Sequence, residues 1–168
     1  PLTGLLNRTT LERRFEELRQ QARVSDAPIA LVLLDLDRFK QVNDTHGHER
    51  GDTVLRDVAY ELRKSLRSFE LAYRLGGEEL MVILPGLEEG EAAALADHVR
   101  RRISDSRPGG LHVTISCGVA SAAGEDLRYE PLFAEADARL YAAKAAGRDR
   151  VLPVPSAAHR ERALRLVS

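Results

Sequence analysis

Residues 71–84 read LAYRLGGEELMVIL, and this stretch decides the fold because it sets two apolar runs on either side of a Gly-Gly pair. The apolar runs predict two β-strands, and the glycines supply the positive φ that a tight hairpin turn requires. The turn then places Glu78 and Glu79 side by side at the hairpin tip. Two fixed carboxylates repel each other unless a cation neutralises them, so the pair favours a divalent metal with oxygen ligands, above all Mg²⁺. The alternative is a solvated tip with two surface glutamates.

A second acidic segment lies upstream, where residues 29–37 read IALVLLDLD. This continuous apolar run predicts a strand buried on both faces of a sheet. Carboxylates at the end of such a strand are costly unless they are paired or bind a metal, and open α/β sheets place their ligands at strand ends. Asp35 and Asp37 share one face, so we expect Asp35 to serve a metal while the other caps the following turn. If this strand lies beside the hairpin, Asp35, Glu78 and Glu79 converge, which resembles the metal site of nucleotidyl transferases and cyclases.

Composition predicts one globular domain. The chain has 168 residues, of which 43% are hydrophobic and 30% charged, enough for one sizeable core. Its one cysteine, Cys117, is expected to be a small buried hydrophobe, and this cysteine usage fits a reducing cytosol. No apolar stretch has the length of a transmembrane helix, and the net charge of −1 gives no general field for nucleic acid or an anionic membrane. The chain opens on Pro1 rather than Met, so we expect a piece of a longer protein.

The remaining hydrophobic pattern predicts the order of the elements. With the central strand and the hairpin it gives a βαββαβ core, an α/β (α+β) fold whose mixed, mainly antiparallel sheet is of the palm or ferredoxin-like kind and is flanked by helices. We expect the domain to occupy residues 1–154 and residues 155–168 to form a short basic helix or a disordered tail without chemistry. Helices are expected over residues 10–23, 51–65, 88–104 and 130–146, strands over residues 111–120 and 150–154, and a loop over residues 43–48.

Several ordered motifs continue along nearly the whole chain. They read LTGLLNR at residues 2–8, DLDRFKQVND at 35–44, HGH at 46–48, GD at 51–52, TISCGVA at 114–120 and DARLYAAKAAGRD at 137–149. Together with GGEEL at residues 76–80, these motifs resemble the GGDEF domain, the bacterial diguanylate cyclase domain, in a variant spelling. The resemblance implies a cytoplasmic domain of a longer protein, which has an upstream sensor or regulatory domain and could itself be anchored in a membrane.

The resemblance also implies a reaction. Two GTP molecules condense to the second messenger cyclic di-GMP and two pyrophosphates, and the catalytic unit is a homodimer because each domain brings one GTP. The catalytic carboxylates Asp35, Glu78 and Glu79, with the Leu36 carbonyl, would hold Mg²⁺ or Mn²⁺. Glu78 could instead accept the 3′-hydroxyl proton, and the sequence leaves both roles open. The alternative function is a weak or inactive module that binds GTP or cyclic di-GMP and acts as a regulatory domain.

Guanine recognition can be argued from residue types as well as from the family. Guanine offers N1–H and N2–H₂ donors and an O6 acceptor, so its site needs a fixed carboxylate and an amide. The resemblance assigns these two roles to Asp52 and Asn43. The alternative is that Asp52 caps a helix start and Asn43 lies in a turn, without any ligand.

Phosphate binding is indicated by lysine usage. Only three of the 25 basic residues are lysine, and two of them, Lys40 and Lys144, match phosphate-binding positions of the family. A compact ammonium fits between phosphate oxygens and a metal. Lys144 and Arg148 are one helical turn apart and can face one side of the helix, and with Phe39 they complete the expected substrate-binding set. The alternative for Lys144 and Arg148 is favourable charge at a helix C-terminus.

Two positions depart from the family pattern. Leu80 replaces the aromatic residue that ends the motif, a loss of core volume that would loosen Glu79 without removing a catalytic group. Arg67 and Glu70 match an Arg-x-x-Asp product-inhibition motif, in which the longer glutamate misplaces the carboxylate. We therefore expect weak product inhibition. An exposed Arg67–Glu70 ion pair without any product binding is the alternative.

Overall fold

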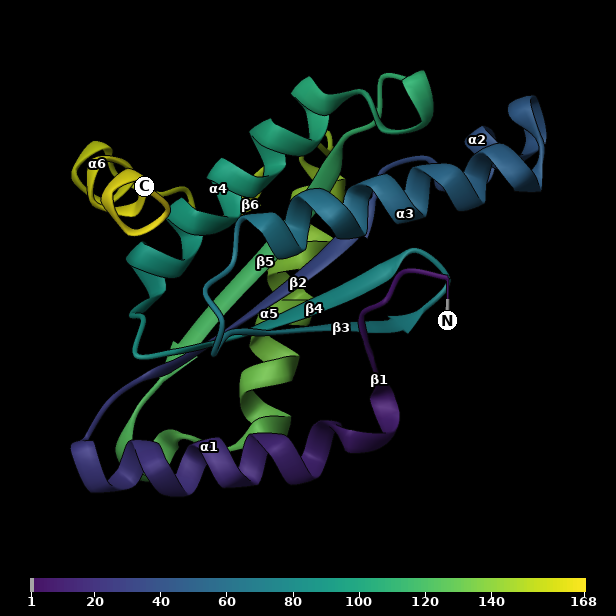
Figure 1. Ribbon diagram of the computed structural model, residues 1–168. Helices are drawn as coiled ribbons and strands as arrows, with labels where there is room; N and C mark the ends of the chain where they lie inside the picture. The colour runs from purple at the N-terminus through teal and green to yellow at the C-terminus, as the bar shows by residue number, and fades with distance from the viewer. Residues whose placement is uncertain (1) are drawn as a thin grey trace.

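The computed structural model describes residues 2–168, and its centre is a six-stranded mixed sheet (Figure 1). The strand order is β1-β3-β4-β2-β5-β6, with β2 antiparallel to both β4 and β5, and β1 and β6 pairing parallel at the two edges. This sheet confirms the predicted mixed, mainly antiparallel architecture. The strands cover Leu6–Asn7 (β1), Ile29–Leu36 (β2), Leu71–Gly76 (β3), Glu79–Pro85 (β4), Ile115–Ala122 (β5) and Val151–Leu152 (β6).

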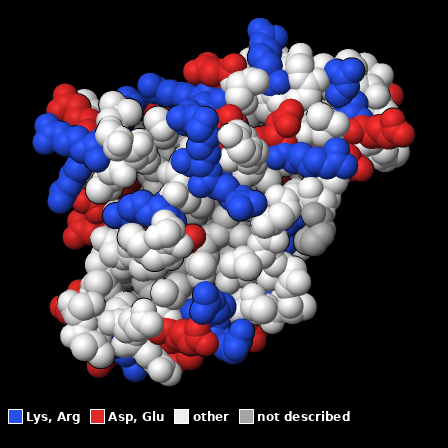
Figure 2. All heavy atoms as spheres, viewed as in Figure 1, with Lys and Arg blue, Asp and Glu red and all other residues white. Residues whose placement is uncertain are grey.

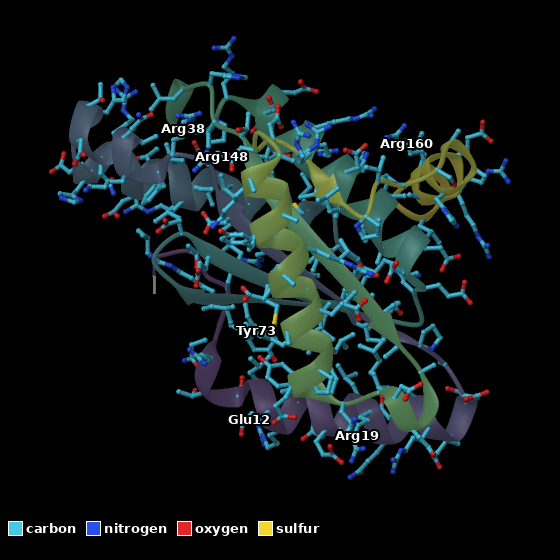
Figure 3. All side chains as sticks on the ribbon, turned by 180° about the vertical axis from the view of Figure 1, so that it is seen from behind. Glu12, Arg19, Arg38, Tyr73, Arg148 and Arg160 are labelled. Carbon is cyan, nitrogen blue, oxygen red and sulfur yellow. The ribbon has the colours of Figure 1, made fainter. Side chains whose placement is uncertain are left out.

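Helices cover both faces of the sheet. Figure 1 shows α3 and α4 across the near face, and Figure 3, seen from behind, shows α5 across the opposite face with α1 at one end. Helix α6 packs against α4. The helices cover Leu11–Ser25 (α1), Phe39–His46 (α2), His48–Lys64 (α3), Glu89–Ser106 (α4), Tyr129–Ala145 (α5) and Ala157–Leu166 (α6), with 3₁₀ turns at Arg8–Thr10, Pro108–Gly110 and Gly124–Asp126.

Strand β2 is buried along its whole length because both of its faces are covered. Ala30, Val32 and Leu34 belong to the core beneath α3 and α4, which includes Val58 and Val99. The alternate residues of the strand belong to a second core beneath α1 and α5; these are Ile29, Leu31 and Leu33. The continuous apolar run in the sequence therefore reflects a strand placed between two layers of helices.

Charge is mixed on the surface that carries α3, α4 and α6. Figure 2 shows basic side chains gathered over these helices with acidic side chains between them. Several of these charges form ion pairs between helices, among them Arg102 with Glu61 and Arg162 with Glu91. No helix within residues 2–168 is long and apolar enough to cross a bilayer.

The loop predicted over residues 43–48 is wrong. Helix α2 occupies Phe39–His46, and α3 starts at His48 after a break at Gly47, whose φ is 85°. The break needs positive φ, a conformation that glycine adopts without strain. Helix α2 is short and buries only Phe39 fully, so its sequence lacks the apolar stripe that identifies a longer helix.

Two other strands and the hairpin turn also differ from the prediction. The strand expected from residue 111 begins at Ile115, which pairs with Leu36 at the end of β2. The last strand shortens to Val151–Leu152. In the tail, Ala157–Leu166 forms α6, which confirms the short basic helix and not the disordered alternative. In the hairpin only Gly77 has positive φ, since Gly76 ends β3 beside a register shift.

Candidate active site

The end of β2 carries a buried aspartate that is paired with a lysine from α5. Asp35 is only 6% exposed, and its Oδ2 lies 2.6 Å from Nζ of Lys144. Burial raises the pKa of Asp35 and the neighbouring Glu78 and Glu79 raise it further, while Lys144 opposes the rise. The Asp35 carboxylate thus lies near two further acidic residues and one lysine, and a bound cation would favour its charged form.

The hairpin tip brings both glutamates to the end of β2. Glu79 lies directly opposite Asp35 in the β2–β4 register, and the Leu36 amide donates a hydrogen bond of 3.3 Å to the Glu78 carbonyl. Within residues 2–168, no three carboxylate, histidine or cysteine side chains are close enough to hold a metal by themselves. The atoms here that could coordinate a metal are carboxylate and carbonyl oxygens, which Mg²⁺ prefers as ligands. Mg²⁺ commonly takes its remaining ligands from water and phosphate. The residues at this site therefore fit such an ion.

Asp37 does not cap the turn that follows β2, so that expectation is wrong. Its carboxylate accepts hydrogen bonds from the hydroxyls of Thr114, at 2.7 Å, and Ser116, at 2.6 Å. It also accepts one of 3.0 Å from the backbone N–H of Asp149. Asp37 thus joins the ends of β2 and β5 to the turn after α5.

The two residues expected to bind guanine come from neighbouring helices. Asn43 lies inside α2 and is half-buried, while Asp52 lies inside α3 and is exposed. The capping alternative for Asp52 is wrong, because α3 begins at His48 with Gly47 as its N-cap. Asn43 also lies in a helix rather than in a turn.

Gly51 is a residue whose role the sequence did not reveal. A Cβ at Gly51 would overlap the side-chain oxygen of Asn43 and would lie 3.3 Å from Cζ of Phe39. The missing side chain therefore makes room for the Asn43 side chain against α3. Phe39 itself is only 8% exposed and belongs to the core, so it supports this arrangement from below.

The basic residues are placed at different parts of the site. Lys40 is exposed on α2, and Lys144 lies near the end of α5 beside Asp35. Arg148 does not share a helix face with Lys144, because α5 ends at Ala145 and Arg148 follows in a turn with φ of 64°. Figure 3 shows Arg148 at the same end of the molecule as Arg38, which follows β2.

Arg67 and Glu70 form a compact pair before β3. The Glu70 carboxylate accepts the Arg67 backbone N–H at 2.7 Å and its Nε at 2.8 Å. The Arg67 guanidinium also lies 4.6 Å from the ring centre of Phe69. Glu70 is only 7% exposed, so the pair is not the exposed ion pair that was weighed as the alternative.

A palm-like sheet with carboxylates at the end of its central strand is typical of nucleotidyl transferases and cyclases. The chain belongs to the GGDEF family within this class: the family profile, described as diguanylate cyclase, GGDEF domain, matches residues 1–150. The C-terminal helix α6 lies beyond the matched residues.

Similar proteins support this membership. Response regulator PleD of Caulobacter vibrioides is 40% identical over 157 residues, which cover 90% of this chain and 35% of PleD. Diguanylate cyclase DgcP of Pseudomonas aeruginosa is 39% identical over 90% of this chain and 23% of its own length. The chain spans less than half the length of the curated relatives it matches.

Solved structures match as well. The GGDEF domain of DgcB from Caulobacter crescentus, in complex with c-di-GMP, is 34% identical with a TM-score of 0.80, covering 90% of this chain and 92% of that one. The active GGEEF domain of a diguanylate cyclase from Vibrio cholerae is 29% identical with a TM-score of 0.81, covering 88% and 96% of the two chains.

Proposed function

We propose that this domain is a diguanylate cyclase that condenses two GTP molecules into cyclic di-GMP and two pyrophosphates. The observation that carries the proposal is the placement of Asp35 between Lys144 and the glutamates of the hairpin, in a chain of the GGDEF family. An anionic site beside a lysine suits a metal-bound triphosphate. We infer that the domain works in the cytoplasm, where GTP is available.

Asp35, Glu78, Glu79 and the Leu36 carbonyl would hold the metal, Mg²⁺ or Mn²⁺. When bound, the ion neutralises phosphate charge and polarises the α-phosphorus toward attack by a 3′-hydroxyl. Glu78 is half-buried and Glu79 exposed, so Glu78 is the better placed of the two to act as a base for that hydroxyl. Both roles for Glu78 are compatible with its place at the turn.

The substrate-binding residues divide by the part of GTP that they hold. Lys40, Lys144 and Arg148 would bind the triphosphate, and in the nucleotide complex Lys144 would turn from Asp35 to phosphate oxygens. Asn43 and Asp52 would bind the guanine edge, with Phe39 and Gly51 setting the position of Asn43. An adenine at this site would leave a polar group unpaired, which costs about 1–3 kcal/mol.

The attacking hydroxyl and the attacked phosphorus belong to two GTP molecules, so we infer that two domains work as an antiparallel homodimer. One domain by itself holds only one of the two GTP molecules that the reaction needs. Isolated domains should then be weak catalysts at low concentration, and an upstream domain that dimerises would raise their activity.

A regulatory module that binds GTP or cyclic di-GMP without turnover is the second candidate. Incubation of the domain with GTP and Mg²⁺, followed by chromatography of the nucleotides, separates the two candidates. A cyclase accumulates cyclic di-GMP and pyrophosphate. A regulatory module binds nucleotide and returns GTP unchanged, which would contradict the proposed activity.

Product inhibition is expected to be weak. Arg67 is already engaged by the buried carboxylate of Glu70, so binding cyclic di-GMP there would have to compete with this pair. We predict affinity at least about tenfold below that of an intact motif, the effect of misplacing one charged partner. Calorimetric titration of cyclic di-GMP, with Arg67→Ala as control, measures it. Submicromolar binding that the control loses would contradict the prediction, and Glu70→Asp should tighten whatever binding remains.

A further inference from the structure

The turn after α5 adopts a backbone conformation that it would not keep unaided. Arg148 and Asp149 have φ of 64° and 46°, so two successive residues with side chains occupy the left-handed region. Such residues are strained unless the surrounding structure holds them. Within residues 2–168 the Arg148 guanidinium forms no ion pair, and it is therefore available to a phosphate.

Asp149 is held from two sides. Its backbone N–H donates to Asp37 at 3.0 Å, and its carboxylate accepts a hydrogen bond of 2.7 Å from Nη1 of Arg100. Arg100 belongs to α4 and precedes Asp149 by 49 residues. The turn that presents Arg148 is thus held by Asp37, directly after β2, through its backbone and by Arg100 of α4 through a side chain.

Arg100 is itself fixed. Its Nε donates to Oδ1 of Asp97 at 3.0 Å, and only 18% of its side chain is exposed. Asp97 is buried and also pairs with Arg101, at 3.1 Å, and with Arg160 of α6, at 3.5 Å. Arg100 therefore bridges the carboxylates of Asp97 and Asp149, which keeps its planar group in one orientation.

We propose that Arg100 is a positioning residue for the triphosphate, acting through Asp149 on the turn that presents Arg148. The inference rests on the proposed function, because it takes Arg148 as a phosphate ligand. Without Arg100 the Asp149 carboxylate loses its partner and the turn relaxes toward less strained conformations. Arg148 must then be ordered when the nucleotide binds, and this cost weakens the affinity for the triphosphate. The guanine-binding residues Asn43 and Asp52 are not affected.

The test compares Arg100→Gln with Arg101→Gln, a matched control that also contacts Asp97 but does not reach Asp149. Calorimetry with Mg²⁺ measures the Kd of a non-hydrolysable GTP analogue, and NMR titration measures the Kd of guanosine. We expect Arg100→Gln to raise the Kd of the analogue about 3- to 10-fold, because one long side chain must then be ordered on binding. Guanosine binding should not change, and Arg101→Gln should behave like the parent protein.

Two further variants make the result decisive. Asp149→Asn keeps a residue that tolerates left-handed φ but removes the charge that Arg100 holds, so it should reproduce the selective loss. In an Arg148→Ala background, Arg100→Gln should add no further loss, because its effect passes through Arg148.

The outcomes separate the inference from the proposed function. Equal effects of Arg100→Gln on analogue and guanosine, or full additivity with Arg148→Ala, would overturn the positioning role. Loss on Arg148→Ala without loss on Arg100→Gln would also overturn it and leave the proposed function intact. A parent protein that binds no GTP analogue would overturn both.

Discussion

The Asp35–Lys144 pair places a competing cation at the position where the metal is expected. Nζ of Lys144 lies 2.6 Å from Oδ2 of Asp35. Binding of a metal must displace this ammonium or share the carboxylate with it. The lysine thus opposes metal binding while the nucleotide is absent and supports phosphate binding when it is present.

We therefore predict that Lys144→Met tightens metal binding by the nucleotide-free protein about threefold, the effect of losing one partly exposed ion pair. The same variant should weaken binding of a GTP analogue. Calorimetric titration with Mn²⁺ measures the first effect. Lys64→Met is the control, because Lys64 lies over the ring of Tyr60 on α3 and not at Asp35. Unchanged or weaker Mn²⁺ binding by Lys144→Met would show that the lysine does not compete.

The packing of Asn43 on Gly51 gives a second prediction at this scale. Gly51→Ala should displace the Asn43 side chain and weaken binding of a GTP analogue about tenfold, the effect of one lost buried hydrogen bond. Thermal unfolding should change little, since alanine favours the helix and the displaced group is the end of a side chain. Adding Gly51→Ala to Asn43→Ala should cause no further loss. A further loss would mean that Gly51 acts by another route.

The site residues that could be predicted from the sequence are those whose role is indicated by the neighbouring residues in the chain. Asp35 follows an apolar run and Glu79 follows a turn, so both were expected to meet if their strands were neighbours. The β2–β4 register places Glu79 directly opposite Asp35. Gly51 and Arg100 could not be predicted in this way. Their roles depend on contacts with Asn43 and Asp149, which belong to other helices and turns.

At the element scale, the close approach of α5 to β5 fixes Lys144 over the sheet. A Cβ at Gly118 of β5 would overlap the backbone of Ala136 and Leu140 in α5. Backbone atoms cannot move aside as the end of a side chain can. The glycine is thus required for the distance at which α5 carries Lys144 to Asp35.

Gly118→Ala should therefore destabilise the protein by about 3 kcal/mol or more, because the helix must shift to admit one methyl group. Gly76→Ala is a suitable control, since a Cβ there meets no atom within 4 Å and its φ is not positive. The control should change stability by less than about 0.5 kcal/mol. Urea unfolding measures both variants. Similar unfolding midpoints for the two would contradict the close packing of α5 on β5.

Elements with strong periodicity were predictable, while α2 was not. The helices α1, α4 and α5 lie within two residues of their predicted bounds, because each has an apolar stripe or an alanine-rich face. Helix α2 is short and polar, and its position depends on packing Phe39 into the core and Asn43 against Gly51. Those contacts exist only once α3 is in place.

At the whole-molecule scale, the sheet divides the interior into two cores, where one sizeable core was expected from composition. The tail forms the short helix that was one of its two expected states. Ala163 of α6 is only 2% exposed, and Arg160 reaches Asp97 on α4. This contact joins the C-terminal helix to the carboxylate that also holds Arg100. The sequence of the tail does not show that α6 packs against α4, because the surface that α6 covers forms only when α4 is folded.

Two domains, each with one GTP molecule, are proposed to form cyclic di-GMP with the help of Asp35 and the hairpin glutamates. The most direct test of this proposal is the rate of cyclic di-GMP formation per protomer by the parent protein and by Glu78→Gln over a range of protein concentrations. We predict that the parent rate rises with concentration in the micromolar range and then levels off, as dimers saturate. Glu78→Gln should keep the fold and lose about 10²-fold or more of the rate, since it removes one charge and no packing. Comparable rates of the two proteins at every concentration would contradict the account.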